Sequence, residues 1–257
     1  MTFDLDQLST WLLGFIWPFA RIGAMLSISP LFGARTLPMR VRLMLALALT
    51  WAVFPLVGQV PSVDPLSLAG VLIMVNQLLI GTAMGLALQV AFAALLVAGQ
   101  VIGASMGLGF ASVVDPQNGI QVPVIGQLYF LLGALVFLAI DGHLALIQVL
   151  AQSFVTLPLG AQGPAPVLLR DLAVWSGLMF SEGTRLALPV VSVILLANLS
   201  LGVATRAAPQ LNVFALGFSI TLLLGFVTMV YALPNLGPLF QALLGRALEI
   251  ARLAAVP

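Results

Sequence analysis

The chain has 257 residues, of which 61% are hydrophobic and only 7% are charged. Soluble domains carry about 25% charged residues, so this composition excludes an ordinary soluble fold and predicts an integral membrane-type protein. No stretch has the pattern of a strand, so we expect an all-α fold whose backbone hydrogen bonds are satisfied within helices. A net charge of +1 argues against a nucleic-acid partner, and a chain without cysteine holds no disulfide or zinc-thiolate site.

The first apolar segment, at residues 11–32, contains an arginine and leads into the most basic loop of the chain. Arg21 inside such a segment costs about 2.5–3.5 kcal/mol on insertion scales, so it should face protein or water rather than lipid. Arg35, Arg40 and Arg42 then fall within eight residues. The positive-inside rule places this loop on the cytoplasmic side.

A long charge-free run follows a second apolar segment at residues 43–57. Residues 65–114 contain no charged side chain. As one helix this run would be about 75 Å long, against a membrane core of about 30 Å, so it either breaks or projects well beyond the bilayer. Gly81 and Gly85 predict close helix packing. The run also contains four amides that are expected to bond to neighbouring helices, Asn76, Gln77, Gln89 and Gln100.

The stretch at residues 99–127 is a poor membrane helix between two apolar segments. Gly99, Gly103 and Gly107 are four residues apart, which predicts a bare helix face that another helix can approach closely. The Asp-Pro-Gln-Asn-Gly sequence at 115–119 favours a turn. Non-helical backbone at membrane depth is tolerated only inside protein or along a water-filled cavity, so this loop should line or block a cavity.

Two short apolar segments follow, at residues 128–140 and 144–157. The Asp-Gly-His sequence between them predicts a turn. The Pro- and Gly-rich loop at residues 158–166 is the best internal boundary of the chain. A longer apolar segment at residues 172–201 carries Glu182 and Arg185, which are three residues apart and can pair on one helix face.

The last part of the chain predicts a polar turn, a further apolar segment and an amphipathic tail. The segment at residues 215–233 should end at Pro234 and Pro238. In all, about six hydrophobic segments are interrupted by proline and glycine, which predicts broken and re-entrant helices. By alternation the preceding turn is cytoplasmic, with the residues Arg206, Pro209, Gln210, Asn212 and Phe214.

Two other functions are open at this point. Ser105 lies in a G-x-S-x-G pattern and His143 is the only histidine, which allows an intramembrane serine protease, although the strand–turn–helix context of that motif is missing. Glu182 and Arg185 allow a small-solute secondary transporter, although the chain shows neither further buried carboxylates nor two matching broken helices. We therefore expect a structural or pore-forming subunit rather than an enzyme, with no cofactor and no metal site.

Three stretches resemble the FliR/SctT family of type III secretion export-gate subunits, with a closer similarity to its flagellar members. They are RIGAMLSISPLFGARTLPMRVR at residues 21–42, GLGFASVVDPQNGIQVPVIGQLYFLLGALVFLAIDGH at 107–143, and RAAPQLNVFALGFSITLLLG at 206–225. The P-Q-x-N-x-F core of the third is the most specific of these patterns.

The resemblance implies a FliP-like part at residues 1–165 fused to a FliQ-like hairpin and amphipathic tail at 166–257. It also implies that the loop at 107–119 is a plug that closes an export channel at rest. The plug and pore residues are Met106, Gly107, Leu108, Gly109, Phe110, Ala111, Ser112, Asp115, Pro116, Gln117, Asn118 and Gly119.

The same resemblance implies the assembly in which such a chain works. Its partners are FliP-like and FliQ-like subunits in a hetero-oligomer, FlhB-like and FlhA-like export proteins, membrane lipid and unfolded export substrates. Its location is the bacterial inner membrane at the flagellar basal body, with the assembled gate projecting to the periplasmic side.

Overall fold

In the computed structural model of the protein, the regular structure is entirely helical over the described residues. The expected all-α, membrane-type fold is confirmed in this part of the chain. The structure describes residues 5–34, 36–58, 60–61, 63–108, 124–160, 163, 167–207 and 213–256.

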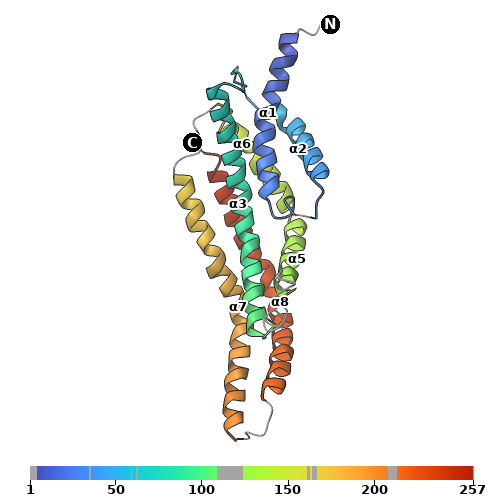
Figure 1. The fold of residues 1–257 in the computed structure, drawn as a ribbon, viewed down its shortest axis with the longest axis vertical. Coiled ribbons are helices and arrows are strands. Elements are labelled where there is room, and N and C mark those ends of the chain that lie inside the picture. The colour runs from blue at the N-terminus through green and yellow to red at the C-terminus, as the bar shows by residue number, and fades with distance from the viewer. Residues whose placement is uncertain are drawn as a thin grey trace. The chain divides into compact units, whose positions relative to one another are not determined.

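The helices range from single turns to very long rods (Figure 1). In chain order they are α1 (Leu5–Ile28), α2 (Met39–Val53), η1 (Phe54–Leu56), α3 (Leu68–Ser105), α5 (Val124–Ala139), α6 (Gly142–Thr156), α7 (Val167–Ala207) and α8 (Val213–Leu253).

Four stretches of helix among the described residues are long and apolar enough to cross a membrane. They are Met39–Leu56, Leu68–Ser105, Arg170–Arg206 and Gly217–Leu253. The pair α5 and α6, bent by 67° at a short break, makes a fifth if counted as one span. Asp141 at this break has a φ of 56°, a left-handed conformation that stops a helix. The expected broken helix is therefore present, at the Asp-Gly-His turn.

Three of the long helices are more continuous than the sequence indicates. α3 runs unbroken for 38 residues, about 57 Å at 1.5 Å per residue. The prediction that Pro234 and Pro238 end a helix is wrong, because α8 continues through both, as α7 does through Pro189. A proline removes one backbone bond, but Leu236 and Phe240 on either side of Pro238 are buried and their packing stabilises the helix there.

The chain forms two compact units that interleave in sequence. The first contains Met1–Val90, Leu138–Ser176 and Leu244–Pro257, and the second contains Ala91–Phe137 and Gly177–Leu243. The predicted parts at residues 1–165 and 166–257 express resemblance to two separate subunits, which is a different kind of division. That prediction stays a prediction.

The first unit is built around the N-terminal half of α3. α1 and α2 lie side by side in it (Figure 1). Gly81 and Gly85 let α1 come close to α3: a Cβ at Gly81 would lie 2.1 Å from the Arg21 carbonyl oxygen, and one at Gly85 would lie 2.8 Å from that of Met25. The indole Nε1 of Trp175 in α7 donates a 3.0 Å hydrogen bond to the Ala87 carbonyl.

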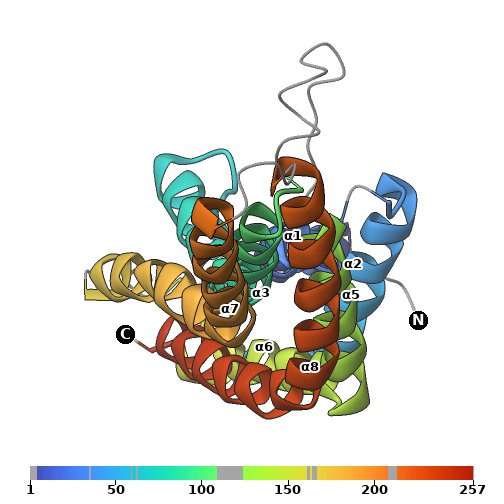
Figure 2. The same cartoon turned by 90° about the horizontal axis from the view of Figure 1, so that it is seen from below.

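The second unit has an aromatic core and a helical hairpin. The ring of Phe92 in α3 lies 5.2 Å from Phe130, 5.9 Å from Phe137 and 5.1 Å from Phe240 between ring centroids, which is the range of favourable ring pairs. The facing parts of α7 and α8 run antiparallel, and a Cβ at Gly217 would meet Leu201 at 3.6 Å (Figure 2).

Candidate functional site

A buried arginine joins three helices of the first unit. Arg21 of α1 is fully buried. Its Nε donates to Gln77 Oε1 of α3 at 2.8 Å, and its Nη1 donates to the Ser153 carbonyl of α6 at 2.8 Å. Its Nη2 donates to the Leu157 carbonyl at 3.0 Å, just beyond the end of α6. The expectation that Arg21 faces protein is confirmed.

Helix geometry explains why this charge is stable there. The C-terminal end of a helix carries partial negative charge, so a cation is favourable beside the Ser153 carbonyl in the last turn of α6 and the Leu157 carbonyl just beyond it. The guanidinium also lies 4.4 Å above the ring of Phe154, at the distance of a cation–π interaction. Every partner of Arg21 in the described part of the chain is uncharged, so hydrogen bonds, the C-terminal end of α6 and the Phe154 ring stabilise the guanidinium without an ion pair.

α3 ends in a motif that a glycine dictates. The Gly107 amide donates to the Ala104 carbonyl at 3.1 Å, and the Leu108 amide donates to the Gly103 carbonyl at 3.0 Å. Gly107 has a φ of 82°. This pattern is a Schellman motif with glycine at the left-handed position. Gly107 therefore stops the helix and lies outside the helical face that Gly99 and Gly103 share, which corrects the expected three-glycine face.

The two ends of the loop between α3 and α5 are held together. A Cβ at Gly99 would lie 2.2 Å from the Gly126 Cα of α5, which no side chain can occupy. Gly103 is less restrictive, because a Cβ there would meet Ile125 at 3.8 Å. Met106 is fully buried, and its side chain fills the space that Gly225 of α8 leaves open.

Most of the predicted plug lies outside the described residues. Met106, Gly107 and Leu108 form the turn that ends α3. Gly109, Phe110, Ala111, Ser112, Asp115, Pro116, Gln117, Asn118 and Gly119 fall in the undescribed range. The structure describes the two stems of the loop, which are the end of α3 and the start of α5.

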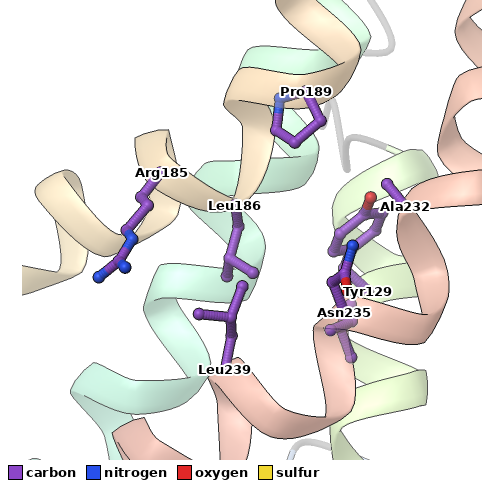
Figure 3. A pocket seen from close by; sticks show the side chains of 8 residues that line it. Tyr129, Arg185, Leu186, Pro189, Ala232, Asn235 and Leu239 are labelled. Atoms are coloured by element: carbon purple, nitrogen blue, oxygen red, sulfur yellow. The ribbon is translucent and has the colours of Figure 1, made fainter.

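Arg185, the partner of Glu182, lies beside a small cavity of the second unit. Arg185 Nη1 is 3.8 Å from Glu182 Oε2, and the two side chains are 65% and 16% exposed. The cavity has a volume of about 40 Å³, room for about one water molecule. Leu186 and Leu239 point toward each other across it, Tyr129 and Asn235 line another side, and Arg185 points away (Figure 3). This cavity is much smaller than the sites that hold drug-sized ligands.

Arg42 fixes the basic loop. Its Nε donates to the Phe32 carbonyl at 3.0 Å, and its Nη2 donates to the Ala34 carbonyl at 3.2 Å. Arg40 and Arg206 are exposed. Of the other residues expected on the cytoplasmic side, Arg35, Pro209, Gln210 and Asn212 lie outside the described residues, and Phe214 is in the first turn of α8.

The serine of the G-x-S-x-G pattern is in a helix. Ser105 ends α3 and its hydroxyl donates to the Val101 carbonyl at 2.8 Å. The motif requires an exposed nucleophile on a strained strand-to-helix turn. Residues 101–108 instead form the last turn of α3 and the turn that ends it.

Comparison with known proteins gives the family. Residues 12–247 match the family described as bacterial export proteins, family 1. The chain is 39% identical over 250 residues to the flagellar biosynthetic protein FliR of Pectobacterium carotovorum subsp. carotovorum, covering 97% of this chain and 95% of that protein. It is 38% identical over 240 residues to FliR of Escherichia coli strain K12, covering 93% and 91%. FliR of Bacillus subtilis strain 168 is 30% identical over 219 residues, covering 84% of each chain. The chain belongs to the FliR family of bacterial export proteins. The resemblance of three stretches thus extends over nearly the whole chain.

Several residues that shape this FliR-family chain were not evident from its sequence. Ser153, Phe154 and Leu157 hold the Arg21 guanidinium, yet no local pattern sets them apart from other residues of an apolar helix. Gln77 was expected to bond to a neighbouring helix, but the sequence did not indicate that its partner would be Arg21. The signal available was the arginine itself, since a charge in an apolar segment requires buried acceptors.

Proposed function

We propose that this chain is a subunit of the flagellar type III protein export gate, which forms and closes the channel through which unfolded flagellar proteins leave the cytoplasm. The observation that carries the proposal is the match to FliR proteins over 97% and 93% of the chain at 39% and 38% identity. The four apolar helices long enough to cross a membrane support a place in the inner membrane.

The role of the loop at residues 107–119 is the finer part of the proposal. Its stems support a closure element, since Gly99 packs against Gly126 and Met106 is buried against Gly225. A loop that starts from fixed stems can be displaced by a passing chain and return to one place. Apolar side chains such as Phe110 can seal a narrow pore by excluding water.

The partners and the arrangement within the assembly also belong to the proposal. Much apolar surface of α7 and α8 is exposed in the single chain: Leu196 is 64% exposed and Leu223 is 66% exposed. Exposed apolar surface of this extent marks interaction with lipid or protein. It supports assembly with FliP-like and FliQ-like subunits, with FlhB-like and FlhA-like proteins at the same gate. The FliP-like part at residues 1–165, the FliQ-like hairpin at 166–257 and the periplasmic projection rest on the family resemblance.

Deletion of the gene in its own host tests the proposal. Export-gate loss should abolish swimming and remove flagellar filament protein from the culture medium, while the same protein is still made in the cell. Expression of the intact chain should restore both. A deletion strain that still secretes filament protein at the normal level would contradict the function.

A further inference from the structure

A groove in the first unit lies between α1 and α2. Its volume is about 290 Å³, and its walls come from Phe19 to Ser27 of α1 and from Met39 to Ala46 of α2, with Leu78 of α3 at one side. This approaches the lower end of the range for small-molecule sites. None of the residues of the predicted plug lines this groove.

Gly23 lines the groove and borders open space. A Cβ built on Gly23 meets no atom within 4 Å. Ala20 and Ala24 flank it with small side chains, whereas Phe19 and Leu43 form apolar walls. The empty space is therefore lined by hydrocarbon along most of its length, and it suits an aliphatic chain.

One charged side chain lines the groove, at the end next to the basic loop. Arg42 is the only charged residue among those that line the groove. Its two bonds to the Phe32 and Ala34 carbonyls use two of its five N–H donors and hold the guanidinium in place. The remaining donors suit a phosphate, because arginine binds phosphate through paired N–H groups.

The length and direction of the groove match the headgroup and upper chain of a lipid. Along α2 the lining extends from Met39 to Ala46, about 10 Å at 1.5 Å per residue. One leaflet of a bilayer core is about 15 Å thick. The groove starts beside the loop that the positive-inside rule places at the cytoplasmic surface, where anionic headgroups attract basic residues.

We propose that this groove binds one anionic phospholipid, with its phosphate at Arg42 and an acyl chain over Gly23 between α1 and α2. The rest of α2 differs from this site: Met44 and Trp51 are 68% and 78% exposed on the open side of the helix. Such residues meet bulk lipid, whereas the groove supplies both a concave apolar surface and a fixed cation. An apolar partner helix would use the same concave surface but would have no use for the free donors of Arg42.

Photolabelling of the full chain tests the site. The protein is reconstituted in nanodiscs of phosphatidylcholine that contain a trace of a diazirine-bearing lipid, either phosphatidylglycerol or phosphatidylcholine. After irradiation, adducts are quantified on peptides that cover residues 19–27 and 39–46. Peptides from the exposed apolar face of α7 at Leu195 and Leu199 serve as the internal reference for bulk lipid. Phosphatidylcholine carries the same phosphate, but its choline cation offsets the charge and weakens attraction to Arg42. We therefore expect several-fold more label in the groove from phosphatidylglycerol than from phosphatidylcholine, and no such preference on α7.

Two matched pairs of variants separate the acyl site from the phosphate site. Gly23→Leu should fill the groove and lower its labelling several-fold, whereas Gly245→Leu, at another glycine with open space around it, should not. Arg42→Gln should remove the preference for phosphatidylglycerol, whereas Arg40→Gln, an equal loss of charge at an exposed residue outside the lining, should leave it.

Three results would overturn the proposal. Equal labelling of the groove and α7 would mean ordinary bilayer contact. Equal effects of Arg40→Gln and Arg42→Gln would mean general attraction to a basic loop. Loss of groove labelling when the chain is reconstituted with the other gate subunits would mean that a protein occupies the groove. None of these results depends on export activity, so the lipid site and the export function can fail separately.

Discussion

Replacing Arg21 by methionine should destabilise the chain strongly, because it removes the donor that joins α1, α3 and α6. Methionine keeps most of the apolar volume of the side chain, so the change acts on hydrogen bonds more than on packing. The Ser153 carbonyl keeps its helical bond from the Leu157 amide at 3.0 Å. Gln77 Oε1 and the Leu157 carbonyl lose the donor that the structure gives them.

The magnitude follows from these two acceptors. A buried acceptor without a donor costs about 1–3 kcal/mol, so Arg21→Met should lower the free energy of unfolding by about 2–6 kcal/mol. For a chain of this size 1 kcal/mol corresponds to about 2–4 °C in Tm. We therefore expect Tm to fall by at least about 4 °C.

Thermal unfolding of the purified chain in detergent, followed by circular dichroism, measures this effect. Arg40→Met is the matched control, since Arg40 is exposed and its loss should change Tm by less than about 1 °C, in line with a surface substitution. Gln77→Leu removes one of the two orphaned acceptors, so combining it with Arg21→Met should lower stability by less than the sum of the single changes. An Arg21→Met chain with the Tm of Arg40→Met, or strictly additive single changes, would refute the reasoning.

Three further predictions concern the second unit and the plug. Gly99→Ala should prevent stable folding or assembly, because its Cβ would overlap the backbone of α5. Gly103→Ala should be neutral or raise Tm slightly, since alanine favours helix by about 1 kcal/mol relative to glycine. Equal Tm values for the two variants would contradict the packing. Deleting residues 109–119 should leave subunit assembly intact and make the membrane leaky to ions, measured by dye release from vesicles that contain the gate; tight vesicles would exclude a plug. Replacing both Glu182 and Arg185 by glutamine should leave export of filament protein within about twofold, because glutamine keeps much of each side chain's volume and the Arg185 side chain is 65% exposed, which weakens the pair. Complete loss of export with normal assembly would favour a charge relay.

The sequence predicts the helical class and the buried environment of Arg21 because both follow from strong, local energies. A charge in an apolar segment needs protein or water around it whatever the fold. Gly81, Gly85 and Gly99 lie where another backbone approaches within the distance of a Cβ. Small residues at four-residue spacing predicted that approach, because close contact excludes any larger side chain.

Long-range arrangement was not predictable in the same way. Pro234 and Pro238 indicated a helix end, yet both lie inside the 41-residue helix α8. A proline weakens a helix locally, and distant contacts such as Phe240 against Phe92 decide whether the helix continues. Likewise, Gly107 differs from Gly99 and Gly103 only through the Schellman bonds that end α3, and four-residue spacing alone does not reveal them.

Affinity purification of the tagged chain from the membranes of its own host tests the export-gate assignment most directly. Quantitative mass spectrometry of the eluate should find FliP-like and FliQ-like subunits in a fixed ratio to the chain, and Gly99→Ala should remove them together. A chain that is recovered intact but alone, or with those subunits in a ratio that varies between preparations, would contradict the account.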